Sequence, residues 1–281
     1  MSNFDELGDR MKRYENITRN YLTRRVPVII RIDGKAFHTW TRGLEKPFDR
    51  TMMGMMQRTM LKLCQEVQGC VFGYTQSDEI TLVLTDYKTI HTDAWFGYNI
   101  QKMTSISASI ATLEFNWILE KEFARELENS LMLHNGCGKT PAYFESSKRA
   151  ELLGSKMNEA VFDSRAFSIP KDEVCNCLIW RQQDATRNSI EAAGHANFRQ
   201  SELHGKNCNE IQEMLFQKGI NWNDYPTSFK RGAACYRVER TVEMEDPRNP
   251  GKMITVKRNG WEIDTEIPIF TQDRDFIERW L

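Results

Sequence analysis

The sequence predicts an α/β (α+β) fold: a ferredoxin-like antiparallel sheet with helices on one face. An apolar, β-branched run over residues 26–32 ends on Asp33, and two further strand-like runs, 70–74 and 80–84, are separated by a few polar residues. Helical apolar spacing occurs over 49–67 and 94–115. This order of elements (strand, helix, strand, strand, helix) matches a ferredoxin-like unit that lacks only its last strand. Residues 160–169, stopped by Pro170, are the best candidate for that strand.

The first strand carries its charge at the C-terminal end. Successive side chains of a strand point to opposite faces, so one face is wholly apolar (Val26, Val28, Ile30 and Ile32). The opposite face ends in Arg31 and Asp33, and Gly34 then lets the chain turn closely around whatever Asp33 binds. The second and third strands form a β-hairpin with Asp78 and Glu79 at or beside its tip.

These two acidic positions can meet at one edge of the sheet. Magnesium prefers oxygen ligands, usually one or two carboxylates with substrate phosphates, and a pair of such ions can catalyse phosphoryl transfer. Aspartate is also common in turns, so two solvated turn residues are an equally good interpretation of the spacing alone. The loop over 35–48 is dense in groups that can bind a nucleotide, and Asp49 is a plausible N-cap for the following helix.

The remaining chain predicts one catalytic domain over residues 1–240, with a helical insertion at about 117–158 and an amphipathic helix or pair of turns within 3–22. Residues 241–281 are expected to complete a β-hairpin, turning within 246–251, and to add a short terminal helix, as part of the same domain. Cys175 and Cys177 form a single Cys-X-Cys motif, with no second cysteine pair at the spacing of a zinc site. We interpret them as thiols in a strand.

Composition excludes several classes of protein. The 281 residues are 40% hydrophobic and 27% charged, as in an ordinary globular protein, and no apolar run is long enough to span a membrane. The polar N-terminus is not a secretory signal, and seven scattered cysteines indicate a reducing compartment, so we expect a cytoplasmic protein. The net charge of −1 does not indicate a nucleic-acid binder, although residues 228–258 hold eight Lys/Arg against four Asp/Glu.

Six short motifs occur in one order along residues 5–240: Arg31-Ile32-Asp33-Gly34-Lys35-Ala36-Phe37-His38, Lys46-Pro47-Phe48-Asp49, Tyr74-Thr75-Gln76-Ser77-Asp78-Glu79, Phe162-Asp163-Ser164-Arg165, Trp180-Arg181-Gln182-Gln183-Asp184 and Phe229-Lys230-Arg231-Gly232. Because it carries these six motifs in this order, the chain resembles the tRNA-His guanylyltransferase family, in particular its 3′-to-5′ polymerase branch. The resemblance implies a polymerase-like palm built on the ferredoxin-like sheet.

The resemblance also implies roles for residues. Asp33 and Asp78, with the backbone carbonyl of Gly34, would hold two Mg²⁺ ions, and Glu79 would belong to the same catalytic group. Nucleotide contacts would come from the loop, the hairpin and later helices: Lys35, Phe37, His38, Lys46, Asp49, Ser77, Lys102, Arg165 and Asn188. Lysine and arginine neutralise phosphate charge, as this assignment requires.

The implied reaction activates an RNA 5′-monophosphate with ATP or GTP and then joins the 3′-hydroxyl of an incoming nucleotide to it. The expected partners are tRNA, nucleoside triphosphates and further copies of the chain in a homotetramer, with no membrane. The tRNA-His-specific branch carries His-Ile-Asn-Asn-Leu-Tyr-Asn where this chain has residues 186–192, and only Asn188 is identical. That departure favours templated repair of 5′-truncated tRNA over untemplated G addition to tRNA-His.

Two other functions are compatible with parts of the pattern. A nucleotidyl cyclase can share a palm and its paired carboxylates, but the Phe162-Asp163-Ser164-Arg165 and Trp180-Arg181-Gln182 motifs argue against it. A non-catalytic RNA-binding module on a ferredoxin-like sheet would need a Lys/Arg-Gly-aromatic strand motif, and the sequence has none.

Overall fold

The computed structural model describes residues 6–137, 140–245, 248–249 and 251–281. Its centre is an antiparallel six-stranded sheet in the order β4-β1-β3-β2-β5-β6. The first four strands and two helices form the predicted ferredoxin-like unit: β1 (Val28–Gly34), α3 (Arg50–Glu66), β2 (Cys70–Gln76), β3 (Glu79–Leu84), α4 (Ile100–Cys137) and β4 (Phe162–Ser168). The fold class and the strand predicted over 160–169 are confirmed.

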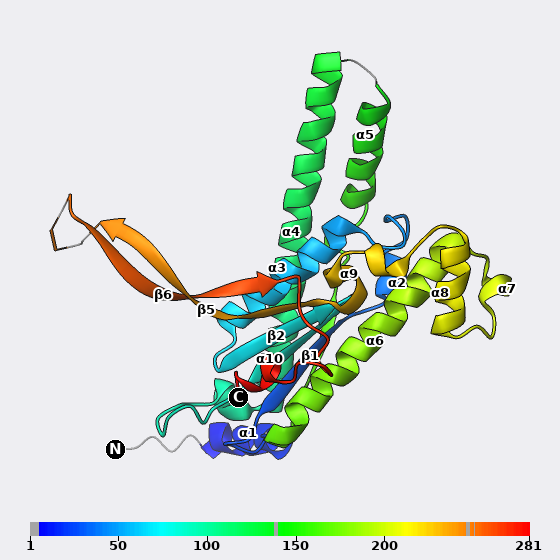
Figure 1. Cartoon of the computed structure of the whole chain (residues 1–281). Helices are drawn as coiled ribbons and strands as arrows, with labels where there is room; N and C mark the ends of the chain where they lie inside the picture. The colour runs from blue at the N-terminus through cyan, green and yellow to red at the C-terminus, as the bar shows by residue number, and fades with distance from the viewer. Residues whose placement is uncertain (1–5, 138–139, 246–247, 250) are drawn as a thin grey trace.

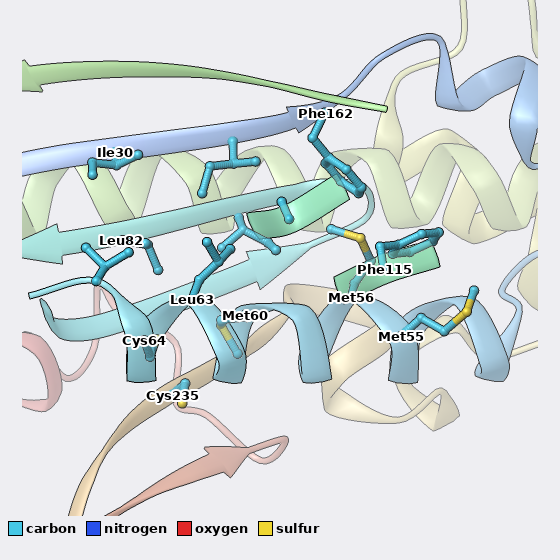
Figure 2. Packing of buried hydrophobic residues seen from close by; sticks show 14 of the residues in the cluster. Ile30, Met55, Met56, Met60, Leu63, Cys64, Leu82, Phe115, Phe162 and Cys235 are labelled. Atoms are coloured by element: carbon cyan, nitrogen blue, oxygen red, sulfur yellow. The ribbon is translucent and has the colours of Figure 1, made fainter. Parts of the chain in front are cut away.

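The alternation of β1 explains how the sheet is covered. Val28, Ile30 and Ile32 face a large core beneath α3 and α4, whereas Ile29 faces a second core on the other side of the sheet. Figure 2 shows Ile30 and Leu82 of the sheet above Met56, Met60 and Leu63 of α3. Ile29 makes the first part of the second face of β1 apolar as well, so that face also needs a cover.

We expected helices on only one face of the sheet, but the structure has helices on both faces. The second face is covered by α6 (Lys171–Asn197) and the C-terminal segment that contains α10 (Asp275–Glu278) (Figure 1). Cys175 and Cys177 lie in α6 and not in a strand, so that prediction was wrong. The apolar residues Val174, Cys175 and Leu178 recur at helical spacing and pack on this face.

The predicted insertion is a helical hairpin. Helix α4 continues without a break through residue 117, and α5 (Pro141–Gly154) returns beside it, so that the pair extends away from the sheet (Figure 1). Thr140 caps α5 by accepting a hydrogen bond from the backbone N–H of Tyr143.

The second projection is the predicted hairpin of β5 (Ala233–Glu245) and β6 (Met253–Asp264), which reaches out from the sheet edge (Figure 1). The proposed domain boundary at residue 240 falls inside β5. The predicted turn lies partly outside the described residues, since 246, 247 and 250 are not described.

Shorter elements complete the chain. They are α1 (Glu6–Ile17), α2 (Phe37–Trp40), the 3-10 turns Trp95–Tyr98 and Trp222–Asp224, α7 (Gln200–Leu203), α8 (Cys208–Gln217) and α9 (Thr227–Arg231). The predicted N-terminal helix starts at Glu6, and none of its residues is buried. Across the described ranges, every helix is too short or too polar to cross a membrane.

Candidate nucleotide and metal site

The strand end and the hairpin tip are joined by the backbone. The N–H of Gly34 donates to the carbonyl oxygen of Asp78 over 3.1 Å, immediately after Asp33. A Cβ on Gly34 would lie 2.3 Å from the Phe37 ring, so only glycine fits this approach. Asp33 itself is directly opposite Glu79 on β3 and Asp163 on β4. The two predicted metal-binding aspartates are therefore neighbours at one edge of the sheet.

The electrostatics of this edge suit a divalent cation. Burial raises the pKa of Asp33, and the nearby Asp163 carboxylate raises it further. Burial also raises the pKa of Asp78, and the charge of Asp33 adds to that effect. Within the described residues the Asp33 carboxylate makes no ion pair or hydrogen bond with another side chain. A bound Mg²⁺ ion would relieve the electrostatic repulsion between these two adjacent carboxylates.

The donor set matches magnesium better than a transition metal. No three His, Cys, Asp or Glu side chains cluster as a metal cage in the part of the chain that the structure describes. Magnesium does not need one, because it is commonly held by one or two carboxylates, water and substrate phosphates. The Asp33 and Asp78 carboxylates with the Gly34 carbonyl fit this requirement.

Glu79 belongs to a different network. Its carboxylate accepts a hydrogen bond from Arg181 of α6 over 2.9 Å and lies 3.8 Å from the Arg31 guanidinium. Burial raises the pKa of Glu79, whereas these two arginines lower it. The side chains of Glu79 and Arg181 are only 9% and 8% exposed, so the pair ties α6 to the sheet beside Asp33. The catalytic role of Glu79 stays a prediction.

Two adjoining pockets surround the hairpin tip. The first is lined by Gly34, Phe37, His38, Ser77 and Asp78, among others. The second pocket shares Ser77 with the first and extends between the 41–49 loop, α6 and α9. Its lining includes three more of the predicted nucleotide contacts: Lys46, Asp49 and Asn188. The structure therefore brings most of the predicted nucleotide-binding residues to one continuous surface at the carboxylate edge.

Three predicted contacts, Lys35, Lys102 and Arg165, line neither pocket, and Phe37 lines the first pocket from a buried position. Arg165 pairs with Asp163 over 3.1 Å on β4, one strand from Asp33. The Lys35 side chain is exposed beside the site, and Phe37 is only 3% exposed and packs among core aromatic rings. Lys102 lies near the start of α4, next to Phe96, on the opposite face of the sheet from Asp33. Their roles in nucleotide binding stay predictions.

Asp49 has a structural role in addition to its place in the pocket. As predicted, it caps α3, accepting a hydrogen bond from the N–H of Met52, and it also binds the N–H of Glu45 and the Arg149 guanidinium. Burial by itself would raise its pKa, but the hydrogen bonds from Arg149, Met52 and Glu45 outweigh burial and lower it. Its carboxylate thereby fixes the pocket loop to both α3 and α5.

Replacement of Asp49 by asparagine is expected to destabilise the protein by about 1–2 kcal/mol at pH 7, because a charged hydrogen-bonded partner of Arg149 is lost. The folded-state pKa lies below the ordinary 3.8, so this stabilisation is present above that pH and lost as the pH falls through the lowered value. Urea unfolding from pH 7 to pH 2 measures the difference.

Asn207→Ala is the matched control for Asp49→Asn. Asn207 caps α8 through the N–H groups of Asn209 and Glu210 without a charge, so its loss should cost about 1 kcal/mol at every pH. A pH-independent effect of Asp49→Asn would contradict the assigned ion pair.

Comparison with known proteins decides the family. The sequence profile of tRNAHis guanylyltransferase matches residues 8–170, more than half of the chain. This chain belongs to the tRNAHis guanylyltransferase family. A bacterial tRNA(His) guanylyltransferase-like protein solved in complex with ATP is 37% identical, with a TM-score of 0.76 and 98% of each chain covered.

Other members of the family agree. A bacterial tRNA(His) guanylyltransferase-like protein in complex with GTP is 36% identical, with a TM-score of 0.70 over 98% of this chain and 99% of the other. The tRNA(His) guanylyltransferase of Schizosaccharomyces pombe is 27% identical over 95% of this chain and 92% of its own. The chain is thus a nucleotidyltransferase of the guanylyltransferase family, and the palm-like fold is confirmed.

The structure adds residues that sequence reasoning did not place in the site. Asp163 is opposite Asp33, and Arg31 and Arg181 both approach Glu79. The centroid of the exposed Trp180 ring is 3.6 Å from the Arg181 guanidinium and 5.6 Å from the Arg31 guanidinium. All four stand inside the quoted family motifs, but only strand register and the docking of α6 bring them to the carboxylates.

Proposed function

We propose that this guanylyltransferase-family enzyme adds nucleotides in the 3′-to-5′ direction to the 5′ end of tRNA, in a magnesium-dependent reaction. The observation that supports it most is the juxtaposition of Asp33 and Asp78 through the Gly34 N–H, beside pockets lined by His38, Ser77 and Lys46. Paired carboxylates next to a pocket with polar and basic lining residues are suited to phosphoryl transfer.

The residues would divide the chemistry as follows. Asp33, Asp78 and the Gly34 carbonyl would hold two Mg²⁺ ions, which when bound supply charge neutralisation at the reacting phosphate. His38 and Ser77 line the pocket next to Asp78 and would position the triphosphate of ATP or GTP. Lys46 and Asn188 line the adjoining pocket and would bind the nucleotide further from the metal.

We further propose that base pairing selects the added nucleotide, which makes repair of 5′-truncated tRNA the reaction. The segment that departs from the tRNA-His-specific motif, residues 186–192, lies on α6, where Asn188, Ser189 and Ala192 line the pocket. Small side chains at Ser189 and Ala192 offer few groups for reading one particular base. Pairing with the opposite RNA strand would then supply the selectivity.

Self-association and location are part of the same proposal. Helix α1 exposes an apolar stripe, and α4 exposes another: Leu7, Met11, Tyr14 and Ile17, then Ile106, Leu113 and Trp117. Such stripes are typical of surfaces covered by another protein chain, so they support the expected homotetramer. We propose that the enzyme works in the cytoplasm, where tRNA and nucleoside triphosphates are available.

A single experiment tests the proposed reaction. A 5′-labelled tRNA that lacks its first nucleotide is incubated with magnesium and all four nucleoside triphosphates, and products are separated by length. Extension by one nucleotide complementary to the opposing base is expected. Addition of G alone, only to tRNA-His and regardless of pairing, would contradict templated repair; a cyclic nucleotide without RNA extension would assign the palm to a cyclase.

A further inference from the structure

A separate pocket, called here the far pocket, lies at the far end of the sheet from the carboxylates. It is formed where four segments meet: the start of β2, the loop after β3, the base of the β5–β6 hairpin and the C-terminal residues. Its lining includes Cys70, Tyr87, Lys88, Arg237 and Arg279. Cys70 and Gln76 are the two ends of β2 and line the far and the near pocket respectively. A strand rises roughly 3.3 Å per residue, so the two pockets are about 20 Å apart.

The far pocket is lined by cations without partners. Lys88, Arg237 and Arg279 are its charged lining residues, all three are exposed, and no Asp or Glu side chain lines it. Among the described residues, none of the three forms an ion pair. The one other charged group at the lining is the carboxyl end of Leu281, whose oxygen accepts a hydrogen bond from Lys171 over 3.0 Å. The three side-chain cations therefore face the concavity without a carboxylate of their own among the described residues.

Several carboxylates on the surrounding segments are bound elsewhere. On the hairpin, Glu239 pairs with Lys257 and Glu262 pairs with Arg240, over 2.6 Å in each case. Beside the loop, the buried Asp86 pairs with Arg24, also over 2.6 Å.

Two more carboxylates near the pocket are also engaged. The Asp264 carboxylate accepts a hydrogen bond from the Tyr236 hydroxyl, and Glu278 of α10 pairs with Arg274, the residue before that helix. The excess positive charge of the pocket is thus a property of how neighbouring charges are paired, and an anion can supply the missing counter-charge.

Aromatic rings hold the two guanidinium groups in place. Arg237 lies 5.1 Å from the Trp261 ring, and Arg279 lies 4.9 Å from the Phe276 ring and 5.4 Å from the Trp280 ring. A guanidinium stacked on a ring keeps its in-plane N–H groups available for a phosphate oxygen. The lining Tyr87 adds a buried hydroxyl without a hydrogen-bond partner among the described residues.

We propose that this pocket binds the phosphodiester backbone of the tRNA substrate, about 20 Å from the reacting 5′ end. The proposal rests on the proposed function, which supplies the RNA. Lys88, Arg237 and Arg279 contact backbone phosphates and carry no sequence preference, since phosphate contacts fix position and register without reading bases. A contact remote from the reacting end suits an enzyme whose selectivity comes from pairing within the RNA.

The test compares two double variants with the parent protein. Arg237→Gln with Arg279→Gln removes two pocket cations, and Lys148→Gln with Lys252→Gln removes the same charge from exposed sites on α5 and beside β6. Dissociation constants for 5′-truncated tRNA are measured over a range of salt concentrations. The pocket variant is expected to bind about tenfold more weakly, with a salt slope smaller by about 2, while the control stays near the parent.

ATP binding to each variant completes the test. Unchanged ATP affinity at the carboxylate site is expected and shows that both variants are folded. Equal tRNA affinity and salt slope in the pocket variant and the control would overturn the proposal. So would loss of a second bound ATP from the pocket variant without an effect on tRNA, because the pocket would then bind free nucleotide.

Failure of the proposed function would look different. If the parent protein bound tRNA but did not extend it, the proposed reaction would be wrong. A smaller salt slope of tRNA binding in the pocket variant would still support the RNA contact. If the parent extended tRNA and the pocket variant bound it like the control, only the pocket assignment would fail.

Discussion

Asp33→Asn is expected to reduce nucleotide addition by about 10³-fold or more. The substitution keeps the size of the side chain but removes one of two charges that would hold the metal ions, and metal clamps supply several kcal/mol of transition-state stabilisation. Each roughly 1.4 kcal/mol corresponds to a tenfold change in rate. Single-turnover extension of the truncated tRNA measures the loss.

The same variant should not be less stable in the absence of metal. Burial and Asp163 raise the pKa of Asp33, so the charged form costs folding free energy above that raised pKa, and the cost disappears as the pH falls below it. Replacing the carboxylate with a neutral amide removes this cost at neutral pH. The metal-free variant should therefore unfold at an equal or higher urea concentration than the parent.

Asp163→Asn is the informative control for this prediction. Asp163 is directly opposite Asp33, but its side chain is 59% exposed and pairs with Arg165. We expect a smaller effect, mainly on nucleotide affinity through Arg165. Full activity in Asp33→Asn, or a greater loss in Asp163→Asn, would show that the metal-binding carboxylates have been assigned to the wrong strand.

Arg181→Met is expected to destabilise the protein by about 3 kcal/mol, the largest effect on folding that we predict. It leaves the Glu79 carboxylate, 9% exposed, without its 2.9 Å partner, and breaking a buried ion pair from one side is costly. Arg31, at 3.8 Å, compensates in part. Urea unfolding of the parent and the variant measures the change.

A double-mutant cycle separates the ion pair from other effects of these substitutions. Glu79→Gln and the combination of Glu79→Gln with Arg181→Met complete it, and the double variant should be less destabilised than the sum of the single changes. Additive effects would contradict a direct Glu79–Arg181 interaction. If the Glu79→Gln variant keeps much more activity than the Asp33→Asn variant, Glu79 holds α6 against the sheet and does not bind the metal.

Much of the site was predictable because its residues lie at the ends of local elements. Period-two alternation places Asp33 at the end of a strand, and the short polar interval after residue 74 places Asp78 in a hairpin turn. Asp49 is recognisable as a cap because an N-cap acts within three residues of itself. These features depend on neighbours in the sequence.

Features that depend on distant contacts were missed or misjudged. Cys175 and Cys177 were assigned to a strand because a short apolar run has no distinctive period, and only packing on the second face of the sheet defines α6. The hydrogen bond from Arg181 to Glu79 spans 102 residues, so nothing in either local sequence indicates it. The far pocket likewise joins segments from residue 69 to residue 281.

The sequence by itself determined the ferredoxin-like order of elements, the two aspartates and the family, because periodicity, turn chemistry and short motifs are local properties of a chain. The tertiary structure alone decided which charges remain unpaired. Glu79 is neutralised by Arg181, whereas the Asp33 carboxylate lacks a cationic hydrogen-bond partner and Lys88, Arg237 and Arg279 lack anionic ones within the described residues. Charge pairing acts over a few ångströms in space, and the chain brings these groups together only when it folds.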